Sequence, residues 1–570
     1  MKSSLQALAL ALASILLPVA NSSTPDNTNT KSCKCFPGDE CWPSEADWSA
    51  FNTTVGGRLI KTVPLGSPCH DPHYDEAKCK ELRDGWLRVS VHLDSSSSIQ
   101  DPIFANASCD PFTPRSSPCL MGNYVQYAVN VSSPADIAAT VRFSEQRNIR
   151  LVIRNTGHDY VGRSTGAGAL AIWTHYLKGI EIKDWASKEH RGKALKIAAG
   201  TMGYEVLQSA AAAKLVATTG ECPTVGVAGG YVQSGGHSPL STAFGLGADQ
   251  TLEFEVVTAD GKLVTANPSR NADLFWALSG SGSGTFGVVV SLTMKAHPDA
   301  VTSGVSLTIQ DPGHDYADIL NVWHDNLPAV LDSGFMATYL ANKATLSFMP
   351  ITGFNRTKAD LEKGLAPFLT AMAARGITVK PLYTQFDSYH DHYVHYFGPL
   401  PAGAFGTAGE YLIGGRLLSR HALPGVASAI NETFQLGAGF IGQAVNVSRF
   451  DSPARAVLPQ WRNTVIMSSY YVPYNFNVPF ADMEARQNFI TDEIMPKIEA
   501  MTPDAGAYIN EADFQQRDWQ KTFFGSNYRK LLEVKRKYDP KGLFYNSLAV
   551  GSEKWKVLDD GRLCVAKCAK

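Results

Sequence analysis

Apolar runs of strand length alternate with helical periodicity between residues 124 and 300. Strands are expected over 126–131, 149–153, 195–198 and 286–294. The runs 252–258 and 262–265 flank Ala259-Asp260-Gly261 and predict a hairpin. Ser133-Pro134-Ala135-Asp136 is typical of a capping box that starts a helix reaching about Arg147. With further helices over 204–215 and 273–278, this region predicts one α+β unit.

The pattern changes after residue 300. Strands over 305–309, 345–349, 411–418 and 465–472 carry aromatic and polar residues together, and helices are expected over 358–374 and 481–501. Such strands suit a sheet with one face on helices and the other lining a cleft. A basic amphipathic helix over 523–537 is expected to return to the first unit. The predicted divisions are 1–20, 21–120, 121–300, 301–505 and 506–570.

The first twenty residues have the layout of a secretory signal peptide. Lys2 precedes an apolar run over 5–17 that is too short to span a bilayer, and no later stretch is apolar for long enough. We therefore expect a secreted, extracellular protein without a membrane partner. Asparagines that can accept N-linked glycans agree with this route: Asn52, Asn106, Asn130, Asn355, Asn431 and Asn446.

Charge narrows the class of partner further. The formal net charge of the 570 residues is -2, and no long basic run appears, so a nucleic-acid partner is not expected. Small molecules or neutral polymers suit this balance better. We expect the chain to act as a monomer.

The ten cysteines are unevenly distributed. Seven of them crowd 33–119, Cys564 and Cys568 close the chain, and Cys222 stands alone between the two groups. In an exported protein this clustering favours disulfides that hold the termini, whereas zinc lacks a clean CxxC pair. Without Cys222 the count is odd, so one further cysteine stays outside an internal pair. A buried thiol is the plain alternative for Cys222.

Two glycine-rich segments carry the candidate chemistry. The first, 154–166, follows a predicted strand and contains His158, and the second, 220–237, contains Cys222. Glycine lets backbone N–H groups approach a diphosphate or a flat ring. A histidine bonded locally within its loop is the plain alternative for His158.

Ordered motifs extend from residue 126 to residue 555. They are Arg154-Asn-Thr-Gly-His158-Asp-Tyr160, Gly220-Glu-Cys222-Pro-Thr-Val-Gly226, Asp273-Leu-Phe-Trp-Ala-Leu, Tyr508-Ile-Asn-Glu511-Ala-Asp and the run from Asn527 to Phe544. In order and spacing they resemble berberine bridge enzyme-like FAD-linked oxidases of the vanillyl-alcohol oxidase / p-cresol methylhydroxylase flavoprotein family, in the secreted fungal-type subgroup.

The resemblance implies a fold and a cofactor. The fold is a two-subdomain FAD-binding domain plus an α/β substrate domain, whose antiparallel sheet covers the flavin; it is not a Rossmann fold. The FAD is implied to be bicovalent, with an 8α-histidyl bond from His158 and a 6-S-cysteinyl bond from Cys222. Two such bonds raise the reduction potential of the ring and favour hydride acceptance. No metal is implied.

The same resemblance assigns further cofactor contacts. These are Arg154, Asn155, Thr156, Gly157, Asp159, Ser164, Gly226, Gly229, Gly230, Ser234, Gly235, Gly236 and Asn546.

Tyr160 and Glu511 are the predicted catalytic pair. Tyr160 lies two residues after His158, on the same side of a locally extended loop, although packing is its plain alternative. Glu511 occupies a position where relatives carry tyrosine or histidine. A carboxylate there can take the proton of a substrate hydroxyl, or can form a salt bridge or a substrate hydrogen bond.

Three other residues are predicted from their positions. Tyr508 is expected to contact substrate. Arg416, after Gly414-Gly415, is expected either to bind an anionic group in the cleft or to form a structural ion pair. Val232 lies where relatives control oxygen access, and its modest size favours an oxidase.

The expected activity is oxidation of an alcohol, carbohydrate or phenolic substrate by hydride transfer to FAD, with O2 as electron acceptor and hydrogen peroxide as product. Two alternatives stay open. One is a flavin dehydrogenase or oxidative cyclase of a secondary metabolite, and the other is a non-catalytic glycoprotein that retains the fold.

Overall fold

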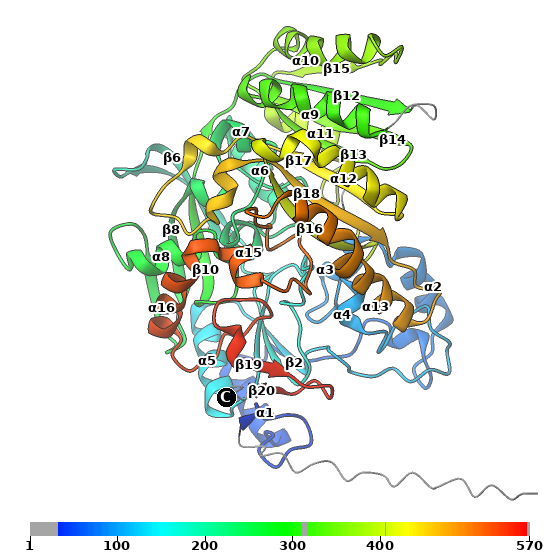
Figure 1. Ribbon diagram of the computed structural model, residues 1–570. Coiled ribbons are helices and arrows are strands. Elements are labelled where there is room, and N and C mark those ends of the chain that lie inside the picture. The colour runs from blue at the N-terminus through cyan, green and yellow to red at the C-terminus, as the bar shows by residue number, and fades with distance from the viewer. Residues whose placement is uncertain (1–31, 311–315, 405, 567–570) are drawn as a thin grey trace, which may run out of the picture.

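The computed structural model describes residues 32–310, 316–404 and 406–566. The predicted signal peptide and Cys568 lie outside the described residues. In Figure 1 the chain forms two parts, with the large sheet and its helices at the upper right and the remaining sheets running from the left side (β6, β8) to the bottom (β2, β19).

A small sheet with the strand order β1-β2-β4-β3 forms the base of the molecule. Its central strands are parallel, while β1 is antiparallel to β2. Helices α1 and α5 pack on it through Trp48, Phe51 and Val141. The bounds are β1 Leu59–Lys61, β2 Tyr127–Asn130, β3 Leu151–Arg154, β4 Leu170–Trp173, α1 Glu45–Thr54 and α5 Pro134–Gln146.

Helix α5 begins as predicted but lacks the full capping box. Ser133 accepts the Asp136 N–H, which satisfies one free donor of the first turn. The Asp136 carboxylate instead accepts the Ser132 N–H and pairs with Arg58 at 2.7 Å. The acidic residue therefore ties the helix start to the neighbouring strand.

An antiparallel sheet with the order β5-β6-β10-β8-β9 stands beside the first. Its hairpin is β8 with β9, as predicted. Phe523, Leu531 and Val534 from the C-terminal helices share one hydrophobic cluster with Phe254 of this sheet. The bounds are β5 Ile180–Ala186, β6 Arg191–Ala198, β8 Thr251–Val257, β9 Leu263–Ala266, β10 Val288–Lys295, α6 Gly203–Ala212, α8 Ala272–Leu278, α15 Trp519–Phe524 and α16 Tyr528–Tyr538.

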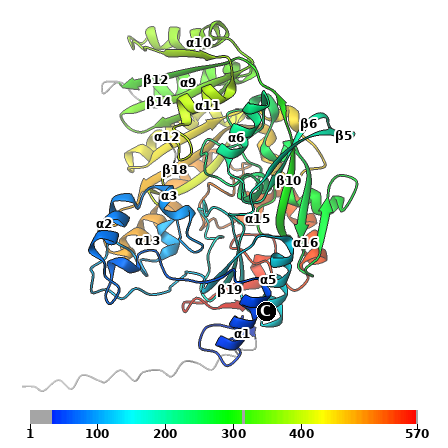
Figure 2. The ribbon, with the colours of Figure 1, turned by 180° about the vertical axis from the view of Figure 1, so that it is seen from behind.

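The large sheet is antiparallel throughout, with the order β15-β12-β14-β13-β17-β18-β16. Helices α9, α10, α12 and α14 bury one of its faces in a continuous core, and both views place α9, α10 and α12 along it (Figures 1 and 2). The bounds are β12 Thr302–Gln310, β13 Met336–Ala341, β14 Thr345–Phe354, β15 Leu382–Phe386, β16 Tyr411–Ser419, β17 Gly439–Ala444, β18 Thr464–Pro473, α9 Tyr316–Asp332, α10 Lys358–Ala373, α11 Tyr389–Phe397, α12 Leu423–Gln435, α13 Phe480–Phe489 and α14 Met495–Met501.

The beginning of the described chain is more regular than its sequence indicates. It forms short helices, of which α2 starts at an Asp75 cap and α4 at an Asp101 cap. Phe104 packs on Phe514, and Phe112 packs on Phe476, so this segment lies against the large sheet. The bounds are α2 Glu76–Gly85, α3 Val89–Leu93 and α4 Pro102–Ala105; the small remaining elements are α7 Ser241–Phe244, β7 Leu215–Val216, β11 His297–Pro298, β19 Trp555–Val557 and β20 Leu563–Val565.

Disulfides hold this first segment and both ends together, as the cysteine pattern predicts. In the described residues the pairs are Cys33–Cys564, Cys35–Cys41, Cys69–Cys79 and Cys109–Cys119. Cys222 belongs to none of these pairs.

Two predicted helices are interrupted. The helix expected over 481–501 becomes α13, a π turn over Ile490–Ile494 and α14, with Pro496 at the start of α14. The helix expected over 523–537 divides into α15 and α16 around a 3-10 turn that begins at Gly525, whose φ is +53°.

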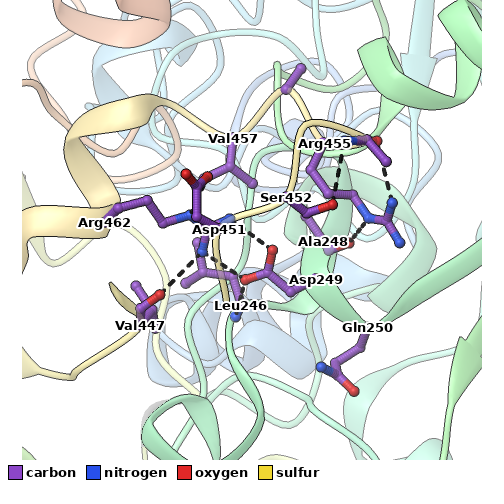
Figure 3. A network of polar contacts seen from close by, with 12 residues as sticks. Leu246, Ala248, Asp249, Gln250, Val447, Asp451, Ser452, Arg455, Val457 and Arg462 are labelled. Carbon is purple, nitrogen blue, oxygen red and sulfur yellow. Dashed lines mark hydrogen bonds and ion pairs between the residues drawn. The ribbon is translucent and has the colours of Figure 1, made fainter. Parts of the chain in front are cut away.

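A buried ion pair joins the segment before β8 to the segment before β18. Arg462 donates to both carboxylate oxygens of Asp249, at 2.8 and 2.9 Å. Nearby, Arg455 donates to the carbonyl groups of Ala248 and Thr251 (Figure 3). These contacts fix the position of the β17–β18 connection relative to the sheet β5-β6-β10-β8-β9.

Among the described helices, none has the length and apolar content that crossing a bilayer requires. The six asparagines expected to accept glycans are all exposed or half-buried.

Candidate active site

A cavity of about 320 Å³ lies between the two glycine-rich segments and strands β16, β17 and β18. Both halves of the molecule therefore contribute to its wall. Most of the predicted site residues line it: His158, Cys222, Tyr160, Tyr508, Glu511, Asn155, Thr156, Gly157, Asp159, Ser164, Gly226, Gly229, Gly230 and Asn546.

The first glycine-rich segment turns sharply after β3. Gly157 has a φ of +85°, and a Cβ there would lie 2.6 Å from a guanidinium nitrogen of Arg154. Only glycine allows this turn over the arginine. Asp159 then closes the loop by accepting the Ser164 N–H at 2.7 Å. The turn leaves His158 half-buried at the cavity wall.

Thr224 brings the two predicted flavin anchors together. Its hydroxyl forms a 2.8 Å hydrogen bond with His158 Nε2 and lies 3.4 Å from Cys222 Sγ. The imidazole and the thiol, 64 positions apart in sequence, are thus neighbours of one oxygen. The 8α carbon and C6 of a flavin lie along one edge of the ring, which matches two anchors placed side by side.

Burial controls the charge of both anchors. It lowers the pKa of His158 to about 4, with smaller contributions from the charges of Arg154 and His92. The imidazole is therefore neutral at neutral pH, with a lone pair available. Burial also raises the pKa of the Cys222 thiol, although the Thr224 hydroxyl opposes that shift.

Along one side of the cavity, glycines occupy positions where a side chain would collide with neighbouring groups. We call this set of glycines the glycine cradle. A Cβ at Gly226 would lie 2.4 Å from Asn155 Oδ1, and a Cβ at Gly284 would lie 2.7 Å from Asn546 Nδ2. Asn546 donates to the Gly284 carbonyl group at 2.6 Å. The backbone is therefore packed closely against polar side chains along one side of the cavity, as an extended dinucleotide requires.

Several buried polar atoms in this wall are available to form hydrogen bonds with a ligand. Within the described residues, Arg163 Nη1, Asn155 Oδ1 and Gln233 Oε1 are buried without a hydrogen-bond partner. The rest of the Arg163 guanidinium donates to the carbonyl groups of Ser547 and Leu548. Buried polar atoms are ordinarily satisfied, so these groups fit an FAD whose polar atoms complete the bonding. The sequence reasoning did not select Arg163, although it lies within the His158 motif.

The opposite wall comes from three strands of the large sheet. Ile413 pairs with Tyr471, and Ile441 pairs with Ser469, so these side chains form adjacent rows on one face. Tyr411 packs edge-on against Tyr471 at 4.7 Å between ring centroids. The side chains on this face are aromatic, aliphatic or polar without a charge.

Tyr160, Tyr508 and Glu511 lie around the same space. Tyr160 keeps 39% of its surface accessible, but that surface faces the cavity. Surrounding protein atoms, and then the charge of Glu511, raise the pKa of the Tyr160 phenol. Tyr508 is buried, and its hydroxyl accepts a hydrogen bond from Asn510 at 2.8 Å.

Glu511 makes a contact that sequence reasoning missed. Its Oε1 lies 2.8 Å from Nε2 of His237, whose other ring nitrogen lies 3.2 Å from Glu221. His237 closes the second glycine-rich motif, and that position is the only sequence signal for it.

Of the two roles expected for Arg416, the structure favours the structural ion pair, because the guanidinium lies 3.8 Å from the Glu499 carboxylate and does not line the cavity. Tyr411 and Ile413 line the cavity, so the alternation of side chains along β16 directs residue 416 to the other face. There its guanidinium donates to the Thr502 hydroxyl and carbonyl groups. Gly415 allows close approach of the Glu511 backbone, because a Cβ would lie 2.0 Å from the Glu511 carbonyl oxygen.

Several predicted residues support the wall from behind. Arg154, Val232, Ser234, Gly235 and Gly236 are not among the cavity-lining residues. Arg154 supports the turn at Gly157, and a Cβ on Gly236 would lie 2.9 Å from the Tyr231 ring. Val232 is fully buried, and its role in oxygen access stays a prediction.

Two family models match the chain. Residues 125–267 match an FAD binding domain, and residues 507–551 match the berberine and berberine-like family. The chain is 46% identical to the FAD-linked oxidoreductase ZEB1 of Gibberella zeae over 97% of both chains. It is 38% identical to a VAO-type flavoprotein oxidase of Thermothelomyces thermophilus over 95% of this chain and 97% of the relative.

Solved structures agree with these relatives. A VAO-type flavoprotein from Myceliophthora thermophila C1, determined at pH 5.0, superposes with a TM-score of 0.90 at 38% identity, covering 94% of this chain and 100% of that one. Glucooligosaccharide oxidase from Acremonium strictum, described with 6-S-cysteinyl, 8α-N1-histidyl FAD, has a TM-score of 0.63 at 22% identity, over 75% and 92% of the two chains. The latter likeness shows the fold alone.

The predicted fold class is therefore confirmed. Mixed helices and antiparallel sheets in the arrangement of a VAO-type flavoprotein surround a cavity whose glycine cradle and unsatisfied polar atoms fit FAD. Together with the full-length relatives, these observations show that the chain belongs to the berberine-like, VAO-type family of FAD-linked oxidoreductases.

Proposed function

We propose that the chain is a secreted oxidase that holds FAD through both His158 and Cys222 and oxidises an alcohol, carbohydrate or phenolic substrate, with O2 as the electron acceptor. The observation that supports this proposal is the Thr224 hydroxyl, which contacts both His158 and Cys222 at the wall of a cavity that Glu511 also lines. When bound, FAD supplies the hydride acceptor.

The cofactor is held by residues outside the large sheet and its helices. The backbone around Gly226, Gly229 and Gly284 leaves room for the dinucleotide, and Arg163 and Asn546 offer donors along the same wall. His158 and Cys222 fix the ring end. Two covalent anchors keep the ring in place even when a wide cavity is open to solvent.

Glu511 receives the substrate proton. One of its oxygens is engaged by His237, and the carboxylate lines the cavity. A hydroxyl that loses its proton to Glu511 becomes a better hydride donor at the adjacent carbon, so both transfers proceed from one alcohol group. Tyr160, neutral because its pKa is raised, donates a hydrogen bond to the same substrate oxygen and fixes its position.

The wall of the cavity indicates a neutral, hydroxylated substrate. Arg163 is the only lysine or arginine among the described cavity-lining residues, and it belongs to the cofactor side. On the sheet side, Tyr411, Tyr471, Gln443 and Ser469 present aromatic rings, an amide and a hydroxyl. Aromatic rings stack on sugars and phenols, and the polar groups bind their hydroxyls. An anionic substrate would lack a partner here.

Export rests on the predicted signal peptide, the disulfides and the accessible glycan acceptors. Disulfides form in oxidising compartments, and all four observed pairs lie in the described residues. None of the six asparagines is buried, so each can carry a glycan. Monomeric state and the domain bounds given above stay predictions.

Replacing Glu511 by glutamine tests the proton-transfer role. The E511Q variant keeps the shape of the side chain but lacks a basic oxygen, so anaerobic flavin reduction should slow about 10²- to 10⁴-fold. Stopped-flow absorbance measures this rate, and the exposed Glu362→Gln variant is the control. A wild-type reduction rate in E511Q would remove Glu511 from this role.

The electron acceptor is tested separately. Reduced protein mixed with aerated buffer should reoxidise rapidly and release one hydrogen peroxide per substrate oxidised. Slow reoxidation by air, with fast reoxidation by a quinone dye, would instead establish a dehydrogenase.

A further inference from the structure

A histidine and two carboxylates form a buried cluster beside the cavity. His237 Nε2 lies 2.8 Å from Glu511 Oε1, and His237 Nδ1 lies 3.2 Å from Glu221 Oε2. The His237 and Glu221 side chains are 8% and 7% exposed, whereas Glu511 is 29% exposed because it faces the cavity. Glu221 and His237 come from the two ends of the glycine-rich segment 220–237, and Glu511 comes from the C-terminal part of the chain, so the fold assembles the cluster.

The cluster places one imidazole between two carboxyl groups. Burial opposes the charge on His237, but Glu221 and Glu511 outweigh it and hold the pKa of the imidazole well above its ordinary value. The remaining titratable neighbours are phenols and the Cys222 thiol beside Glu221. Burial raises the pKa of that thiol and of the phenols Tyr160, near Glu511, and Tyr393, near Glu221. Tyr508 packs edge-on against His237, and burial raises its pKa. Tyr231 and Tyr389 near Glu221 are raised in the same way, so all these phenols are neutral.

We propose that His237 is a positioning residue: as an imidazolium fixed by Glu221, it holds one oxygen of Glu511 and keeps that carboxylate ionised and aimed into the cavity. This rests on the proposed function only in that Glu511 accepts the substrate proton. The arrangement of the three side chains stands independently of the reaction.

The contact with His237 offsets the loss of hydration that the Glu511 carboxylate undergoes when substrate closes the cavity. A carboxylate in a cavity closed by substrate loses its hydration, which favours its protonated, inactive form. The charged hydrogen bond from His237 offsets this effect. In the reaction the substrate O–H bond breaks and an O–H bond forms on the second Glu511 oxygen. The adjacent C–H bond breaks and a C=O bond forms, and bound FAD would accept the hydride with its electron pair. The cluster then passes from a net charge of -1 to neutral.

Removal of the imidazolium should change the pH dependence in a defined direction. Without His237, Glu511 stays protonated up to a higher pH. The decline of the flavin-reduction rate at low pH therefore shifts toward higher pH. Loss of one charged hydrogen bond corresponds to about one to two pH units. His237→Asn should show this shift, and Glu221→Gln a smaller one, because neutralising residue 221 lowers the pKa of His237.

The matched control is His190→Asn, a half-buried histidine remote from the cavity whose ring bonds to the Lys193 carbonyl group. Its profile should coincide with that of the unmodified protein. An unshifted decline at low pH in His237→Asn would overturn the positioning role.

A direct measurement of the imidazole separates this inference from the proposed function. Holoprotein labelled with ¹⁵N-histidine should show one charged imidazole that persists well above pH 6.5, absent in His237→Asn. Titration of that residue at its ordinary value of about 6.5 would overturn the inference, whatever the activity. A charged His237 together with full flavin reduction in E511Q would leave the cluster intact and contradict the proposed function alone. The titration itself is measured on the unmodified sequence, and the His237→Asn protein serves only to assign the signal.

Discussion

At the scale of single residues, Thr224 determines how the flavin anchors can react. Its hydroxyl engages Nε2 of His158, so Nδ1 is the ring nitrogen left for a bond to the cofactor. We predict that hydrolysis of the holoprotein yields an 8α-N1-histidyl flavin, in which Nδ1 carries the bond. NMR of the recovered aminoacyl flavin distinguishes the two isomers. Recovery of the N3 isomer would show that the Thr224 contact does not persist in the holoprotein.

Residue identity was easier to predict from sequence than side-chain direction. His158, Cys222 and Glu511 were found because each lies within an ordered motif, and all three line the cavity. The direction of Arg416 could not be predicted, because the two glycines before it indicate close approach of another segment but not which face of β16 lines the cavity. His237 was missed because its partners, Glu221 and Glu511, are neighbours only in the folded chain.

At the scale of elements, the glycine-rich segment 220–237 is fitted to its neighbours by steric contact. At Gly226 the φ is -71°, which any residue adopts, so only the approach of Asn155 excludes a side chain. We predict that Gly226→Ala displaces Asn155 and hinders incorporation of the flavin, so that the purified protein contains less of it. The absorbance ratio of flavin to protein measures the loss.

The control for this prediction is Gly376→Ala, where a Cβ meets nothing within 4 Å but φ is +77°. That variant should lose about 1–2 kcal/mol of stability through its backbone alone and keep its flavin. Equal flavin content in both variants would refute the steric account of the cradle.

Element positions followed from periodicity where the pattern was long, and failed where the chain was interrupted. The hairpin of β8 and β9 and helices α5 and α10 lie close to their predicted ranges. The helix expected over 481–501 was divided because a π turn leaves the apolar periodicity almost unchanged. Short helices α2, α3 and α4 escaped notice because disulfides and local caps stabilise them, and neither produces a long amphipathic pattern.

At the scale of the whole molecule, the Arg462–Asp249 pair joins the segment before β8 to the segment before β18 (Figure 3). Both side chains are nearly inaccessible, at 10% and 4%. We predict that Arg462→Ala leaves the Asp249 carboxylate buried without its partner and destabilises the fold by about 3–5 kcal/mol. Chemical denaturation monitored by tryptophan fluorescence measures this loss.

An exposed pair of the same chemistry provides the control. Arg420 binds Asp332 through two hydrogen bonds, with exposed fractions of 43% and 51%. Arg420→Ala should cost about 0–1 kcal/mol, because solvent screens the charges. Similar losses in the two variants would contradict the role assigned to burial.

The central claim is that one flavin is bound covalently to both His158 and Cys222. Mass spectrometry of proteolysed holoprotein tests it most directly. The account predicts that the peptide containing His158 and the peptide containing Cys222 are recovered as one species, joined through a single flavin. Recovery of both peptides unmodified from flavin-containing protein would contradict it.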